Sequence, residues 1–185
     1  MMASKGWLVN VSVEHVSASV GVGVIALQDL EIGTVVLRES PLFVAASIID
    51  DESLIDAFQA CSNETLEKIW SLCGEGLKGK IRTNGVALCS EGAVGGVFEH
   101  FSRLNHACSS NCSFNFLDRE MEVKTIRIVK FGEQLTINYR PNDHLSSFER
   151  KISLLKRFGF LCECEMCVKE LREDDASGEV MGYSM

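Results

Sequence analysis

The chain has 185 residues, 46% of them hydrophobic and 24% charged, which fits one globular domain with a hydrophobic core. Its formal net charge of -8 argues against direct nucleic-acid binding, which depends on clustered Lys and Arg, and favours a basic peptide or protein partner. Apolar runs are too short to span a bilayer, and the N-terminus lacks a signal-peptide pattern. The sequence therefore predicts an intracellular protein, nuclear or cytoplasmic, without membrane contact.

Short strands alternate with turns in the first 45 residues. Apolar and polar residues alternate over the first of these segments, and paired glycines or a proline introduce the later ones. The predicted strands are Trp7–Val13, Val20–Ala26, Thr34–Leu37 and Leu42–Ala45. The period then changes to that of helices, predicted over Asp51–Ala60 and Asn63–Leu72 and followed by a glycine-rich loop over Gly74–Gly79. This region, about residues 47–80, is predicted to be a helical insert between strand-rich halves.

The second half returns to strands and ends in a helix. Segments Ser113–Leu117 and Met121–Thr125 flank a polar turn and predict a hairpin, and Gln134–Tyr139 predicts a further strand. Ser146 and Glu149 have the spacing of a capping box, and Gly159 is placed to end the helix that follows. A short helix is expected up to Arg172, and an acidic tail over 173–185 is expected to be flexible.

Cysteines gather near the end of the chain. Cys162-x-Cys164-x-x-Cys167 places three thiols within six residues, a spacing that favours one zinc ion in a reducing compartment. A fourth ligand is needed, and His106, Cys108 and Cys112 are the candidates. From spacing alone, the zinc can be structural, or catalytic with water in the open position.

The polar stretch Ser102–Cys112 holds the other concentration of reactive side chains. Asn105 and His106 can form a catalytic pair, ligate a metal or simply stabilise a turn. A nucleophilic Cys108 or Cys112 activated by His106 is a further reading, weakened because catalytic partners usually come from separate segments. Residues alone leave these readings open.

Three ordered motifs resemble those of the SET-domain protein-lysine methyltransferases. Asn105–Asn111 resembles N-H-x-C-x-P-N, Gly132–Tyr139 resembles G-E-E-L-x-x-x-Y, and Phe158–Cys167 resembles the post-SET motif Y-G-F-x-C-x-C-x-x-C. The resemblance covers most of the chain and is nearest to the SMYD-like group of fungal type, without its MYND finger. It implies a mixed, mainly β fold of small curved sheets with a pseudoknot, a helical insert and a C-terminal zinc-binding segment.

The resemblance also implies the site and its cofactors, S-adenosylmethionine and a structural Zn²⁺. Tyr139 and Phe158 would be catalytic residues lining a lysine channel. Cys108 would complete the zinc site of Cys162, Cys164 and Cys167, leaving Cys112 to packing. The residues implied to hold S-adenosylmethionine are Gly21, Gly23, Asn84, Ser102, Leu104, Asn105, His106 and Phe160. The implied division is a SET domain over 1–161 and a post-SET zinc segment over 162–172.

The implied function is methylation of a lysine amine in a histone or another protein. Phe158 stands where many members have Tyr, which is expected to change the number of methyl groups added, and Ser110 replaces the usual Pro. Val20 and Val22 replace basic residues near the first glycines. Two alternatives remain: a catalytically weak SET-like module that binds cofactor and peptide, and a redox-responsive zinc protein that uses the same four cysteines.

Overall fold

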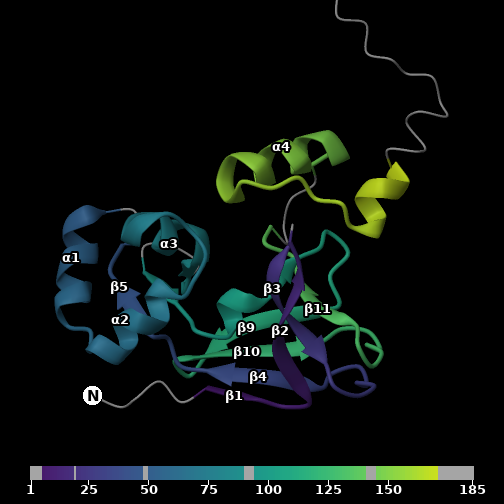
Figure 1. Ribbon diagram of the computed structural model, residues 1–185, viewed down its shortest axis with the longest axis horizontal. Helices are drawn as coiled ribbons and strands as arrows, with labels where there is room; N and C mark the ends of the chain where they lie inside the picture. The colour runs from purple at the N-terminus through teal and green to yellow at the C-terminus, as the bar shows by residue number, and fades with distance from the viewer. Residues whose placement is uncertain (1–5, 19, 48–49, 90–93, 141–144, 171–185) are drawn as a thin grey trace, which may run out of the picture.

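A computed structural model describes residues 6–18, 20–47, 50–89, 94–140 and 145–170. Its strands form two four-stranded sheets and one three-stranded sheet within these ranges. The first sheet has the order β1-β4-β10-β9, with all neighbours antiparallel. Its strands are β1 (Gly6–Leu8), β4 (Val35–Glu39), β10 (Glu120–Thr125) and β9 (Cys112–Leu117). This sheet forms the lower side of the molecule in Figure 1.

The second sheet combines two strands from the start of the chain with two strands from its second half. Its order is β2-β3-β11-β8, antiparallel except for the β11–β8 pair, which is parallel. Its strands are β2 (Val11–Ser17), β3 (Gly21–Ala26), β11 (Gln134–Ile137) and β8 (Asn105–His106). A third sheet contains β5 (Phe43–Ala45), β7 (Gly95–Val97) and β6 (Val86–Ala87). The mixed, mainly β prediction is confirmed.

The first predicted strand is wrong in one respect, because Trp7–Val13 is not continuous. The chain breaks at Asn10, whose φ of 57° lies in the left-handed region that Asn tolerates better than most residues. The segment before it pairs with β4, and the segment after it pairs with β3 in the other sheet. A corner that passes the chain between sheets leaves the apolar alternation unchanged, so the pattern did not reveal it.

The main hydrophobic core lies between the first two sheets. It contains residues from both, such as Val24, Leu37, Val123 and Leu135, each with at most 2% of its surface exposed. Tyr139 packs at its edge. Because the core ends at the β11–β8 pair, the residues that follow these two strands are held at the boundary between core and solvent.

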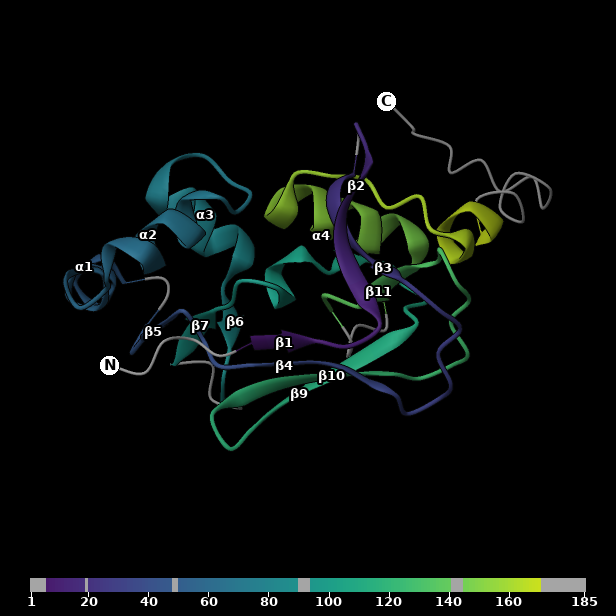
Figure 2. The same cartoon turned by 60° about the horizontal axis from the view of Figure 1, so that its bottom comes forward.

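The helical insert comprises α1 (Asp51–Gln59), α2 (Asn63–Trp70) and α3 (Gly76–Asn84), which lie together beside β5 in Figures 1 and 2. The prediction of a loop over Gly74–Gly79 is wrong, because α3 already begins at Gly76. Gly74, with a φ of 115°, makes the turn, and α3 then buries Ile81 completely in a separate core of the insert. Tertiary burial therefore outweighs the low helix propensity of Gly76 and Gly79.

Polar contacts tie the insert to the sheets. Lys68 pairs with Glu99 at 3.0 Å, and Arg103 Nη2 donates to Ser71 Oγ at 2.7 Å. Arg103 belongs to η1 (Phe101–Arg103), the single turn of 3₁₀ helix that leads into β8. The end of α2 is thus fixed against the segment that the sequence predicts to bind a cofactor.

The C-terminal helix α4 (Ser147–Phe158) lies on the side of the molecule away from β9 and β10 in both views (Figures 1 and 2). Ser146 and Glu149 form the predicted capping box, and Gly159 ends the helix in the left-handed conformation with a φ of 79°. A short helix follows over 165–170, and the predicted flexible tail lies outside the described residues. In the described part of the chain, no helix is long and apolar enough to cross a membrane. The domain boundary at residue 161 stays a prediction.

Candidate active site and metal centre

Asn111 links the two halves of the site. Its buried side chain accepts from the Thr136 N–H at 2.7 Å and donates to the Gln134 carbonyl at 2.8 Å and to Glu133 at 3.1 Å. Together with the parallel pairing of β8 and β11, these bonds hold the segment after Asn105 beside the segment before Tyr139. These segments carry the first two motifs of the resemblance, Asn105–Asn111 and Gly132–Tyr139.

Tyr139 lies at the centre of an aromatic group. Its ring centroid is 4.9 Å from that of Phe158, 5.2 Å from that of His106 and 6.5 Å from that of Phe160. Its hydroxyl donates to the Leu104 carbonyl at 2.7 Å. Burial raises the pKa of Tyr139, with a smaller contribution from Cys73, so the phenol stays protonated and acts as a hydrogen-bond donor at neutral pH.

His106 connects the aromatic group to the cysteines. Its Nδ1 accepts from the Tyr139 backbone N–H at 3.1 Å, and its Nε2 lies 3.3 Å from Cys108 Sγ. Burial, assisted by the charge of Arg150, lowers the pKa of His106 to about 4, so the imidazole is neutral at physiological pH. Because Nδ1 accepts, the single ring proton belongs on Nε2, where it faces the Cys108 sulfur.

Donors converge on Gly23 from two elements. A Cβ built on Gly23 would lie 2.3 Å from Gln134 Nε2 and 2.9 Å from Asn105 Nδ2, so any larger residue would collide with both amides. Asn105 donates to the Val22 carbonyl at 2.9 Å, whereas Gln134 Nε2 is buried without a partner among the described residues. Gly21 has a φ of 76° and open space at its Cβ position. Gly23, which is predicted to hold the cofactor, therefore lies directly beside Asn105.

The other residues predicted to hold the cofactor differ in their surroundings. Ser102 Oγ is buried with no partner in the described part of the chain, which leaves a hydroxyl for an external group. Asn84 is 7% exposed and uses its Nδ2 to donate to the carbonyls of Cys73 at 2.8 Å and Lys80 at 2.7 Å. Phe160 has its ring 6.0 Å from His106. The orphaned Ser102 and Gln134 atoms fit a polar cofactor such as S-adenosylmethionine.

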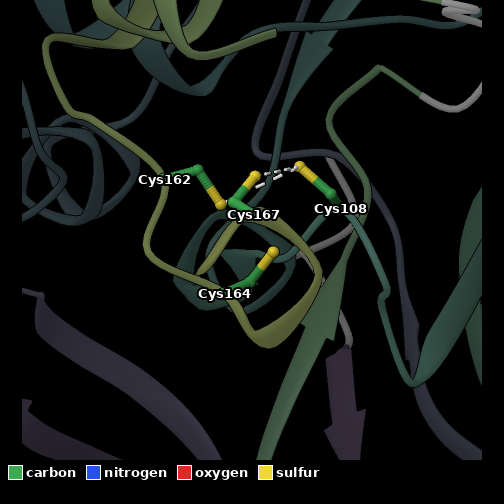
Figure 3. A group of neighbouring side chains, drawn as sticks. All are labelled: Cys108, Cys162, Cys164 and Cys167. Atoms are coloured by element: carbon green, nitrogen blue, oxygen red, sulfur yellow. Dashed lines mark hydrogen bonds between the residues drawn. The ribbon is translucent and has the colours of Figure 1, made fainter. Parts of the chain in front are cut away.

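Cys108, Cys162, Cys164 and Cys167 converge in space (Figure 3). Their Sγ atoms all lie within 4.8 Å of one another, with Cys108 3.5 Å from Cys167 and 3.9 Å from Cys162. Tetrahedral zinc with Zn–S bonds of about 2.3 Å needs sulfurs about 3.8 Å apart, so the cluster fits this ion. Cys112 is buried in the main core and takes no part. Of the open candidates for a fourth cysteine ligand, Cys108 is the one in the cluster.

Burial and close packing shift the pKa values of Cys108, Cys162 and Cys164. Burial raises the pKa of Cys162 to about 11 and also raises that of Cys108, which neighbouring sulfurs raise further. Burial acts on Cys164 in the same direction, but hydrogen bonds from the backbone N–H groups of Cys167, Cys108 and Ser109 outweigh it and lower its pKa to about 7. Thiols packed this closely without a cation oppose one another's ionisation, and a divalent metal removes that conflict.

A second group of side chains, Glu39, Glu99 and His100, also has possible metal-ligand atoms close together. Its oxygens are already in use: Glu39 accepts from the backbone N–H groups of Glu99, His100 and Phe101, and Glu99 pairs with Lys68. Glu39 is only 1% exposed. We therefore assign it the role of holding the turn that precedes Ser102.

Two residues of the site carry no clear sequence signal. Gln134 occupies the place of the second Glu in G-E-E-L, and only this departure from the motif points to it. Arg150 lies on the first turn of α4, where an arginine is ordinary, yet its Nη2 lies 3.8 Å from Cys167 Sγ. Residues far apart in sequence meet here, which a pattern along the chain does not reveal.

Comparison with known proteins agrees with this geometry. The model of the SET domain family matches residues 21–140. The Schizosaccharomyces pombe histone-lysine N-methyltransferase set5 is 30% identical over 161 residues, which cover 83% of this chain and 49% of set5. The mouse histone-lysine N-methyltransferase Smyd1 is 34% identical over 113 residues, 52% of this chain and 23% of Smyd1. The chain thus spans about half the length of set5 and less of Smyd1.

Among solved structures, a humanized mutant of the Chaetomium thermophilum Polycomb Repressive Complex 2 matches 77% of this chain and 15% of its own, with 16% identity and a TM-score of 0.44. The family assignment does not rest on this structural likeness. It rests on the match to the SET-domain family model, which covers more than half of the chain and includes Gly21, Asn105 and Tyr139. This match shows that the chain belongs to the SET-domain family, and the cluster that joins Cys108 to three cysteines beyond residue 140 agrees with it.

Proposed function

We propose that this protein is an S-adenosylmethionine-dependent protein-lysine N-methyltransferase. The observation that carries the proposal is the position of Tyr139: its hydroxyl is fixed on the Leu104 carbonyl, and its ring lies beside Phe158. The names of set5 and Smyd1 support this activity and suggest a histone substrate. The net charge of -8 suits a basic substrate segment, and a histone substrate would place the protein in the nucleus.

The cofactor would be held by the segment around Asn105. Gly21 and Gly23 would let the backbone approach it closely, and the unpartnered Ser102 Oγ and Gln134 Nε2 would supply hydrogen bonds. When bound, S-adenosylmethionine would supply an electrophilic methyl group that an unprotonated lysine amine takes by in-line displacement. The chain must therefore align the amine and exclude water.

Tyr139 and Phe158 would meet these requirements. The buried, protonated Tyr139 hydroxyl is suited to orienting the amine and not to removing its proton, because burial raises its pKa. Apolar surroundings lower the pKa of an entering lysine ammonium, which favours the neutral amine that reacts. The faces of the Tyr139 and Phe158 rings then favour the cation that develops as the new C–N bond forms. Phe158 in place of Tyr would influence how many methyl groups are added.

The four cysteines would hold a structural Zn²⁺. With four sulfur ligands the ion keeps no open position, so it would fix the Phe158–Cys167 segment against Cys108 and take no part in methyl transfer. Phe158 and Phe160 pack against the cysteines in one small cluster. The metal would thereby position one wall of the site.

The test is cofactor binding by calorimetry on the zinc-loaded protein, followed by mass spectrometry of histones and basic peptides after incubation with S-adenosylmethionine. Saturable cofactor binding and a mass gain on lysine are expected. Binding without methyl transfer to any substrate would support the alternative of a binding module. Absence of cofactor binding by folded, zinc-loaded protein would refute the proposal.

A further inference from the structure

Arg150 meets three different segments around the cysteines. Its Nη1 donates to the Leu145 carbonyl at 2.8 Å, and its Nη2 lies 2.6 Å from Glu170 and 3.8 Å from Cys167 Sγ. The side chain is 13% exposed, and its Nε is buried without a partner within the described residues. Glu170 supplies one compensating anion, but a buried donor that lacks an acceptor remains costly.

Four thiolates around one Zn²⁺ carry a net charge of about -2, which is costly to bury as well. Cys162 is 3% exposed and Cys167 is fully buried. The Arg150 guanidinium lies against this group, with its Nη2 3.8 Å from Cys167 Sγ. The opposite charges are placed to compensate each other.

We infer that Arg150 is a positioning residue of the metal centre, donating N–H hydrogen bonds to the zinc-bound thiolates and offsetting their charge. The inference rests on the zinc site proposed above. The cysteine cluster has a second donor, because the Nε2–H of His106 faces the Cys108 sulfur at 3.3 Å. His106 in turn accepts from the Tyr139 backbone at 3.1 Å, so the same ring joins the metal centre to the proposed catalytic residue.

Hydrogen bonds to thiolates have two measurable consequences. They lower the energy of the sulfur lone pairs, which shifts sulfur-to-metal charge-transfer bands to higher energy, and they reduce the reactivity of the sulfur toward oxidants. They also orient the ligands, and loss of such an outer partner typically weakens metal binding by about 10-fold or more. A purely structural ion pair between Arg150 and Glu170 would leave the bands unchanged.

The experiment compares the wild-type chain with the variants Arg150→Gln, Glu170→Gln and Lys156→Gln. Zinc affinity is measured by competition with a chromophoric chelator, and charge-transfer bands are measured after replacing zinc with Co²⁺. Arg150→Gln is expected to weaken zinc by about 10-fold and to shift the Co²⁺ bands to lower energy. Glu170→Gln breaks the ion pair but keeps the guanidinium, so its bands should match those of the wild type.

Lys156→Gln is the matched control, since Lys156 is exposed on the last turn of the same helix and its loss changes the net charge equally. It should alter neither measurement. If Arg150→Gln does not fold, Arg150→Lys is compared with the wild type in the same two measurements. This variant keeps the cation but loses the branched donors, so its Co²⁺ bands should shift by a smaller amount.

Two outcomes are distinguishable. Wild-type zinc affinity and unshifted Co²⁺ bands in the Arg150 variants would overturn this inference and leave the zinc site intact. A wild-type chain that takes up no zinc with its cysteines reduced would overturn the zinc site and the inference together, without bearing on cofactor binding by Ser102 and Asn105.

Discussion

Tyr139 shows how one side chain depends on two distant partners. Its hydroxyl is held by the Leu104 carbonyl and its backbone N–H by His106, so both ends of the residue are fixed by the segment just before Cys108. The hydroxyl therefore has a defined direction before any substrate enters, which lowers the cost of aligning an amine. Removing it should affect the reaction more than the fold.

For Tyr139→Phe we expect kcat to fall by about 100-fold, because the reacting centre loses an oriented hydroxyl oxygen that can accept a hydrogen bond from the amine. The free energy of unfolding should fall by about 1 kcal/mol through the lost hydrogen bond to Leu104. Cofactor affinity, measured by calorimetry, should stay near the wild-type value and serves as the control. An unchanged kcat would remove Tyr139 from the mechanism.

His100 provides a pH dependence of stability. Its hydrogen bond to the buried Glu39, at 3.2 Å, raises the pKa of its imidazole above 6.5. The folded state thus holds the proton more tightly than the unfolded state, so the contribution is present below the unfolded pKa and is lost as the pH rises through the folded pKa.

We therefore expect the difference in unfolding free energy between the wild type and His100→Gln to be larger at about pH 6 than at about pH 9. The glutamine keeps a donor for Glu39 but does not titrate. Urea denaturation at both pH values measures the difference. A difference that does not change with pH would exclude His100 as the group responsible.

At the scale of secondary-structure elements, two glycines make opposite contributions. Gly159 ends α4 with a φ of 79°, a conformation that costs other residues about 1 kcal/mol or more. Gly79 lies inside α3, where a Cβ would meet its neighbours at 3.7 Å or beyond, an ordinary contact distance. One glycine is required by the backbone, and the other is tolerated at the expense of helix stability.

The same substitution should therefore have opposite signs at the two positions. Gly159→Ala is expected to lower the free energy of unfolding by about 1 to 2 kcal/mol, whereas Gly79→Ala should raise it by up to about 1 kcal/mol. The free energy of unfolding of both variants is measured by urea denaturation under identical conditions, and each variant serves as the control for the other. Equal signs would contradict the backbone argument.

At the scale of the whole molecule, the C-terminal segment has little core of its own. Its cluster buries Leu154, Cys162 and Cys167, with Phe158 and Phe160 packed against them, whereas the sheets share the large main core. Metal binding should thus supply much of the free energy that orders this segment. The two parts should respond differently when the metal is withdrawn.

Chelation of zinc should increase amide hydrogen exchange across residues 158–170 while leaving β9 and β10 protected. Cofactor binding should weaken as well, because Phe160 and His106 adjoin the cysteines. Cys164→Ser should reproduce the effect, and Cys73→Ser, which changes an exposed thiol outside the cluster, should not. Uniform exchange across the chain would contradict a locally ordered metal segment.

The sequence by itself determined most of the local structure and indicated which segments form the candidate site. The capping box at Ser146, the αL glycine at Gly159 and the hairpin around Asp118 depend on neighbouring residues, so local patterns predicted them. The motifs around Asn105, Tyr139 and Cys162 indicated the family in the same way, because each motif is short and continuous.

Only the tertiary structure decided which residues meet. It brought Cys108, which cysteine spacing alone left open and only the family resemblance favoured, to the three late cysteines. It also turned the chain between sheets at Asn10 and extended α3 through two glycines, because Ile81 is buried. It also brought Arg150 to the cysteines. These outcomes depend on packing between segments distant in the chain, whose free energies exceed the local propensities that a sequence pattern reports.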